Sequence, residues 1–213
     1  QTTVEHKSYD LIVKEYCIDP SWFLEQTMEK VGSSILFSAS FSPLDYYQEV
    51  LGGGEDSLTY RLPSPFPNEN RLVLVDASIQ TTYQMRTQSI PKIAASIERL
   101  VKTKTGNYLV FFPSFQYLDQ VADYFHDVYP EYAIQIQGSK LNEAEREDFL
   151  AAFVDQPERT LIGFCVLGGI FSEGIDLVGE RLIGTVVVGV GLPQVNHEQE
   201  LIKEYYDEKR NQG

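Results

Sequence analysis

Two uninterrupted apolar runs in the second half of the chain predict buried strands. Residues 160–166 (TLIGFCV) and 182–190 (LIGTVVVGV) are rich in β-branched and aliphatic side chains without polar alternation. This pattern is typical of strands that are covered on both faces, as in parallel α/β sheets. A polar, glycine-rich loop lies between the runs, and loops at the carboxyl ends of such strands are where ligands bind. The loop is therefore the first candidate for the chemistry of this protein.

Helical and strand patterns alternate along the rest of the chain. Apolar residues at helical spacing over 89–101, with Pro91 in the first turn, predict a helix packed against a core. A second helix is expected after Ser114, which stands at its N-cap, and a third after Asn142, whose spacing to Glu145 is that of a capping box. Shorter helices are expected at 20–31 and 44–51, and a last one from Asn196. A strand or a ragged hairpin is expected at 9–18, and further strands at 35–37, 71–78, 108–113 and 133–136.

This alternation predicts right-handed βαβ units and therefore an α/β fold. We expect a three-layer domain with a mostly parallel central sheet of about five to seven strands, flanked by helices. The three prolines of residues 61–70 predict an extended connector. The prediction is a single domain over residues 1–213. Because the last residues stop inside or just after a helix, we expect the domain to be cut from a longer protein.

Composition narrows the class of protein. No apolar run approaches the ~18 residues that span a bilayer, and the first residues lack the features of a signal peptide. We therefore expect a cytoplasmic location and no membrane partner. A net charge of −14 argues against a free-standing nucleic-acid binder, because such proteins usually present a positive face to the phosphates. The cysteines, Cys17 and Cys165, stand in apolar contexts that favour two buried thiols over a disulfide or a metal site.

Small hydroxyl side chains follow two of the predicted strands. Ser38, Ser40 and Ser42 lie on the turn after the run 35–37, where they could bind a phosphate or simply cap local backbone. Ser114 combines a strand end, a hydroxyl and a helix N-terminus, which together favour an anion. The triple glycine at 52–54 is followed by acidic residues rather than by the GK[ST] of a phosphate-binding loop, so we interpret it as a helix stop.

Three stretches, in order, carry a resemblance to a known family. ILFSASFSP (35–43) resembles a motif written as a Ser-Ala-Thr or Ser-Gly-Thr turn followed by LSP, YLVFFPSF (108–115) resembles motif IV, and GGIFSEGIDLVGERL (168–182) is similar to motif V, with SEGID its most diagnostic part. The set resembles the C-terminal RecA-like motor domain of superfamily 2 DNA helicases of the DinG and XPD type. The resemblance covers about residues 33–192.

The resemblance implies an ATP-dependent DNA helicase, moving 5′ to 3′ and acting in DNA repair, of which this chain is the second motor domain. It implies contacts to ATP from Glu173, Gly174 and Asp176, with Asp176 on a ribose hydroxyl. The alternative for Asp176 is a carboxylate that caps backbone amides of its own loop. The implied nucleic-acid contacts are Ser38, Ser40, Ser114, Gly168, Gly169 and Ser172. For Phe115 and Phe171 we favour packing in the core over stacking on bases, because both neighbour buried runs.

The chain also departs from the family pattern. Ser40 stands where the family commonly has Thr, and neither GxxxxGK[ST] nor a DEAH box is found. The final glutamine- and arginine-rich motif and the four iron–sulfur cysteines are missing as well. We therefore expect no complete catalytic site and no metal site in this chain, which is inactive alone. ATP and Mg²⁺ would be held mainly by an N-terminal motor domain of the same protein.

The expected partners are that N-terminal motor domain and single-stranded DNA. The question whether the parent protein holds an iron–sulfur cluster outside this chain stays open. Two other functions stay open as well: the motor-like domain of a nuclease-linked DinG relative, and a non-catalytic α/β nucleic-acid-binding module.

Overall fold

A computed structural model describes residues 2–7, 10–54, 56–192 and 196–210. The chain forms two compact units, which we call the terminal unit (Gln1–Leu72 with Val195–Gly213) and the sheet unit (Val73–Gln194). The prediction that residues 1–213 act as one domain stays a prediction. Among the described residues, no helix combines the length and the apolar character needed to cross a bilayer.

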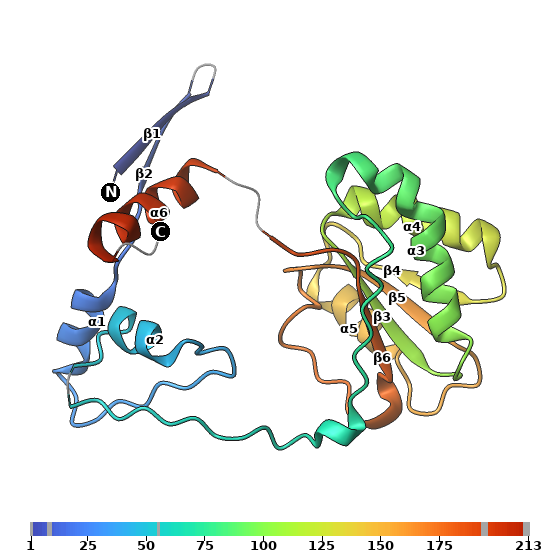
Figure 1. Cartoon of the computed structure of the whole chain (residues 1–213), viewed down its shortest axis with the longest axis horizontal. Helices are drawn as coiled ribbons and strands as arrows, with labels where there is room; N and C mark the ends of the chain where they lie inside the picture. Colours follow the sequence, from blue (N-terminus) through green and yellow to red (C-terminus); the bar gives the residue numbers. More distant parts are fainter. Residues whose placement is uncertain (1, 8–9, 55, 193–195, 211–213) are drawn as a thin grey trace. The chain divides into compact units, whose positions relative to one another are not determined.

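Four parallel strands form the sheet in the described part of the sheet unit. They are β3 (Asn107–Phe112), β4 (Ala133–Ile136), β5 (Leu161–Val166) and β6 (Gly184–Val187), in the order β4-β5-β3-β6. Its helices are α3 (Arg86–Val101), α4 (Phe115–Val128) and α5 (Glu143–Ala151), with short 3₁₀ turns η2 (Tyr83–Met85) and η3 (Gly179–Arg181). Figure 1 shows α3 and α4 on one side of the sheet and α5 on the other.

Alternation along the central strand β3 explains the three layers. Tyr108, Val110 and Phe112 join the buried cluster that α3 and α4 cover, whereas Leu109 joins a second cluster with Phe149 of α5. Successive side chains of a strand point to opposite faces, so one strand contributes to both cores. The predicted α/β fold with a parallel sheet and flanking helices is therefore confirmed.

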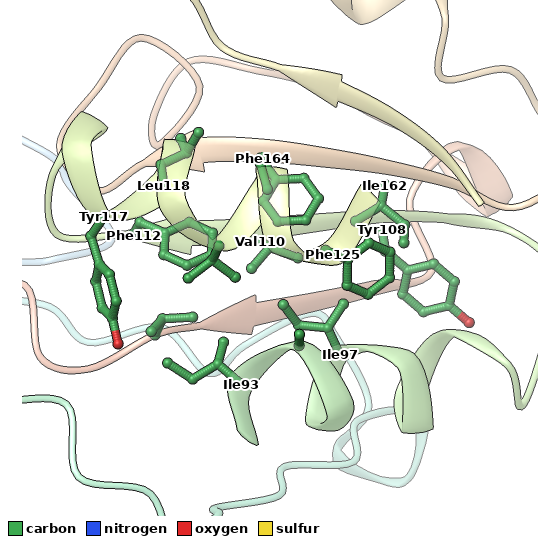
Figure 2. Close-up of a cluster of buried hydrophobic side chains, with 14 of the residues drawn as sticks. Ile93, Ile97, Tyr108, Val110, Phe112, Tyr117, Leu118, Phe125, Ile162 and Phe164 are labelled. Atoms are coloured by element: carbon green, nitrogen blue, oxygen red, sulfur yellow. The ribbon is translucent and has the colours of Figure 1, made fainter. Parts of the chain in front are cut away.

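Aromatic rings fill the larger core. The Phe164 ring is stacked on that of Phe112 with centroids 5.8 Å apart, and Phe125 of α4 lies 5.9 Å from Phe164. Figure 2 shows Ile93 and Ile97 of α3 directed toward these side chains. The helix begins at Arg86, which leaves Pro91 inside it rather than in its first turn.

Two predicted strands are wrong. Residues 35–37 form no strand and are exposed, with Ile35 at 84% and Phe37 at 89% of full accessibility. The run 71–78 is likewise irregular and exposed, with Val75 at 86%. The apolar character was identified correctly, but a strand also needs a partner for its backbone groups, and no described strand pairs with either run. The described sheet is accordingly smaller than expected.

In its described residues, the terminal unit combines two antiparallel strands with three α-helices. Its elements are β1 (Thr2–Lys7), β2 (Asp10–Glu15), α1 (Ser21–Met28), α2 (Leu44–Val50), the 3₁₀ turn η1 (Asn68–Asn70) and α6 (His197–Arg210). Asp19 ties α6 to the start of the unit, because its Oδ2 accepts from Lys209 Nζ and from Tyr205 Oη, each at 2.7 Å. The hydrogen bond from Lys209 holds the pKa of Asp19 well below its usual range.

The two thiols should react differently with iodoacetamide at pH 8. Cys165 is buried as predicted, and burial raises its pKa to about 12, so little of it is thiolate at pH 8. The prediction was wrong for Cys17, which is exposed. We expect mass spectrometry to find alkylation of Cys17 alone in the folded chain and of both thiols in urea. Equal rates for the two thiols in the folded chain would contradict the burial of Cys165.

Candidate functional site

The candidate site lies at the carboxyl edge of the parallel sheet. Phe112 and Val166 pair in register at the ends of β3 and β5, and Leu167 N donates to Phe112 O at 2.8 Å. One step further, β3 leads through Ser114 into α4, while β5 leads into residues 167–178, which we call the glycine loop. Ser114 and the glycine loop therefore leave adjacent strands at the same edge of the sheet.

Tight turns fold the start of the glycine loop back on the end of β5. Gly168 adopts φ +70°, a left-handed conformation that favours glycine. Gly169 N donates to Val166 O at 3.1 Å, and Ser172 N donates to Gly169 O at 2.9 Å. The Ser172 hydroxyl also donates to Val166 O at 3.0 Å. The loop is thus anchored to the strand from which it departs.

Gln137, which the sequence did not indicate, supports the loop from the neighbouring strand. It follows β4, its backbone N donates to Phe164 O at 2.9 Å, and its side-chain Oε1 accepts from Val166 N at 2.9 Å. The side chain thereby replaces the carbonyl that a longer β4 would have supplied. A Cβ on Gly169 would come within 2.9 Å of Gln137 Nε2, so glycine there permits the close approach. A polar residue after a short strand usually lies on the surface, so Gln137 could not be recognised as a supporting residue from the sequence alone.

Two contacts to α5 hold the rest of the glycine loop. Phe171 is 1% exposed and its ring stacks on Phe149 with centroids 4.2 Å apart, which confirms that it belongs to the core. Phe115 is half-buried against the larger cluster, in line with the same interpretation. Arg146 Nη2 donates to Gly174 O at 3.1 Å. A loop that is held through Gly169, Phe171 and Gly174 is suited to presenting side chains in a set direction.

The two acidic side chains of the loop point to no partner within the described structure. Glu173 and Asp176 are exposed, and neither side chain forms a hydrogen bond or ion pair with another described residue. The alternative in which Asp176 caps its own loop is therefore not seen in the described ranges. Its carboxylate is free to accept hydrogen bonds from a ligand.

The predicted serines are already engaged locally. Ser114 caps α4, because its Oγ accepts from Tyr117 N at 3.4 Å. Ser38 and Ser40 lie in the terminal unit, exposed, with their hydroxyls 2.9 Å apart. The predicted nucleic-acid residues therefore fall in both units, and their common role stays a prediction. No cluster of three or more His, Cys, Asp or Glu side chains suited to a metal occurs among the described residues.

Comparison with known proteins finds a helicase domain family and relatives that are named as helicases. Residues 97–213 match the family model described as helicase C-terminal domain. A probable ATP-dependent helicase of Methanocaldococcus jannaschii is 23% identical over 194 residues, which cover 88% of this chain and 30% of that protein. The ATP-dependent DNA helicase CHL1 of Candida albicans is 24% identical over 208 residues, or 90% of this chain and 25% of that protein. CHL1 of Scheffersomyces stipitis is 24% identical over 206 residues, covering 86% and 24%. The chain thus spans less than a third of the length of these relatives.

Proposed function

We propose that this chain, which belongs to the helicase C-terminal domain family, serves as the second motor domain of an ATP-dependent DNA helicase. The fold and the relatives are those of the DinG and XPD type. In this proposal the sheet unit closes over ATP that is bound mainly by an N-terminal motor domain and contacts single-stranded DNA. Movement from 5′ to 3′, a cytoplasmic location and a role in DNA repair are parts of the same proposal.

The observation that carries the nucleotide role is the exposed carboxylate of Asp176 on an anchored loop. Phosphoryl transfer depends on positioning and charge stabilisation from all sides of the nucleotide. The glycine loop can supply a carboxylate for a ribose hydroxyl, with Glu173 and Gly174 shaping the surface beside it. The chain has no lysine-bearing phosphate loop. Its residues therefore fit one side of an ATP site, and Mg²⁺ and the triphosphate belong with the missing half.

The DNA role rests on the small residues at the same edge. Gly168 is exposed, Ser172 is half-buried, and Ser114 opens α4, so small residues offer backbone amides and hydroxyls at this edge. Such groups bind phosphates without reading sequence. The negative net charge is compatible with this role only if the affinity is shared with the other motor domain.

Exposed apolar side chains support an N-terminal motor domain as partner. In the terminal unit Trp22 is 57%, Phe23 61% and Phe37 89% exposed. The Trp22 and Phe23 ring centroids lie 4.9 Å apart, and exposed apolar side chains that lie together usually mark a surface that another protein part covers. The family relatives are three to four times longer than this chain, which leaves ample sequence for such a partner.

Asp176→Ala in the parent protein should lower kcat/KM for DNA-stimulated ATP hydrolysis by about 10- to 100-fold, the effect of losing one hydrogen bond to a charged group. Wild-type protein should also lose rate with an ATP analogue that lacks the contacted ribose hydroxyl, while the variant should lose little more. This non-additivity identifies a direct contact. Asp123→Ala, an exposed carboxylate on α4, is the matched control and should leave the rate unchanged.

An unchanged ATPase rate in Asp176→Ala would remove the nucleotide role. The isolated chain is expected to hydrolyse no ATP, and DNA-stimulated hydrolysis by it would overturn the half-motor proposal.

A further inference from the structure

Arg86 stands in an unusual environment at the first position of α3. The guanidinium carbon lies 5.2 Å from the centroid of the Tyr83 ring and 5.1 Å from that of Tyr117. Tyr83 is 79% exposed, whereas Tyr117 is 1% exposed. The arginine is thus stacked near one buried and one exposed ring, a geometry that orients its planar N–H donors.

No carboxylate neutralises Arg86 among the described residues. It takes part in none of the ion pairs there, and its buried Nε has no hydrogen-bond partner. A cation at the N-terminus of a helix is also disfavoured by the helix dipole. Helix stability therefore gives no reason for arginine at this position, although the chain has 31 acidic residues with which it could have paired.

The hydrogen-bond network connects this arginine to the carboxyl edge of the sheet. The Tyr117 hydroxyl lies 2.6 Å from Ser89 Oγ, which in turn donates to Arg86 O at 2.8 Å. Tyr117 belongs to the first turn of α4, and its backbone N donates to the cap, Ser114. In Figure 2, Tyr117 lies at one end of the buried cluster, beside Phe112 at the end of β3. The arginine is therefore placed next to the edge where we propose that DNA binds.

We propose that Tyr83 and Arg86 form a contact point for single-stranded DNA, in which Arg86 binds a backbone phosphate and the Tyr83 ring stacks on the adjoining base. This inference rests on the proposed DNA role and extends it to two residues outside the helicase motifs. Arginine is suited to phosphate because its donors are fixed in one plane. An exposed aromatic ring beside a cation is the combination that binds single strands without sequence preference. Tyr117 holds the guanidinium from the protein side.

The test measures the affinity of the parent protein for two fluorescent oligonucleotides of about 20 units, one oligothymidine and one abasic, by anisotropy at low salt. Tyr83→Ala should raise Kd for oligothymidine about 5- to 100-fold and leave Kd for the abasic strand unchanged, because only the former has bases to stack. Arg86→Gln should raise Kd for both strands and reduce the slope of log Kd against log salt by about 0.7, the value for one phosphate contact on a single strand.

Two variants serve as controls. Tyr83→Phe keeps the ring and should bind as the unaltered chain does. Arg99→Gln removes the same charge from an exposed site on the same helix and should change neither the base dependence nor the salt slope. Thermal unfolding checks that Arg86→Gln folds. If Arg86→Gln does not fold, Tyr83→Ala alone tests the contact point, because the Tyr83 ring is mostly exposed and its removal should not affect folding.

The outcomes separate this inference from the broader one. Normal binding by Tyr83→Ala and Arg86→Gln, while the unaltered parent protein binds both strands, overturns the contact point and leaves the DNA role in place. Equal losses for both oligonucleotides in Tyr83→Ala overturn the stacking. Failure of the unaltered parent protein to bind either strand overturns both proposals.

Discussion

Phe164→Ala is expected to lower the free energy of unfolding of the sheet unit by about 3–5 kcal/mol, the usual cost of removing a fully buried phenylalanine. Phe164 is 0% exposed and contacts the rings of Phe112 and Phe125, so it joins the central strands to α4. The variant loses the transfer free energy of the ring and leaves a cavity that rigid neighbouring strands cannot close. Because the free energy of unfolding of a domain is roughly 5–15 kcal/mol, this loss is a large share of it.

Urea unfolding followed by circular dichroism measures the change, and hydrogen exchange of β3 and β5 amides assigns it to the sheet unit. Val190→Ala, which shortens a side chain that is 75% exposed, is the control and should change stability by less than about 0.5 kcal/mol. A loss below about 1 kcal/mol in Phe164→Ala would show that this core is not packed as described.

Gln137→Ala should destabilise the sheet unit by about 1–3 kcal/mol and loosen the glycine loop, because the Val166 amide loses its acceptor at a buried site. In the parent protein the same change should raise KM for ATP, since the loop that carries Asp176 would no longer be held in one position. The expected signature is faster hydrogen exchange in residues 166–174 together with reduced stability.

Gln135→Ala is the matched control for that experiment. Gln135 lies on β4, two residues before Gln137, and is half-buried. Its Oε1 is buried without a hydrogen-bond partner among the described residues. Removing this amide sacrifices no hydrogen bond of its oxygen, so a smaller effect is expected. If both variants behave alike, the hydrogen bond to Val166 contributes nothing specific.

The sequence predicted those parts of the fold in which a short segment contains its own explanation. The strand at 161–166 is a continuous apolar run, and the helix after Asn142 begins with a capping box that the structure confirms. Residues 35–37 show the limit of such patterns. Their apolar side chains indicate that something should bury them, but the covering surface is not encoded in the segment itself.

The same limit applies to the candidate site. The glycine loop was recognisable because its glycines and acidic residues stand together in SEGID. Gln137 and Arg86 were not, because each acts through a contact with a residue about 30 positions away, and a lone glutamine or arginine is ordinarily a surface residue. Neighbourhood in space, which a single sequence does not display, is what gives these two residues their roles.

The hydrogen bond of Ser172 affects how tightly the proposed motor domain would bind a DNA strand. Its hydroxyl proton is already committed to Val166 O in the unliganded chain. A phosphate that claims this proton gains one hydrogen bond and breaks another, so the net free energy is small compared with that of an unoccupied donor. Contacts formed by such exchange can be released as readily as they form. A protein that moves along a strand has to release each phosphate in every cycle. The Ser172 hydroxyl can return to Val166 O when the phosphate leaves, so release costs little free energy.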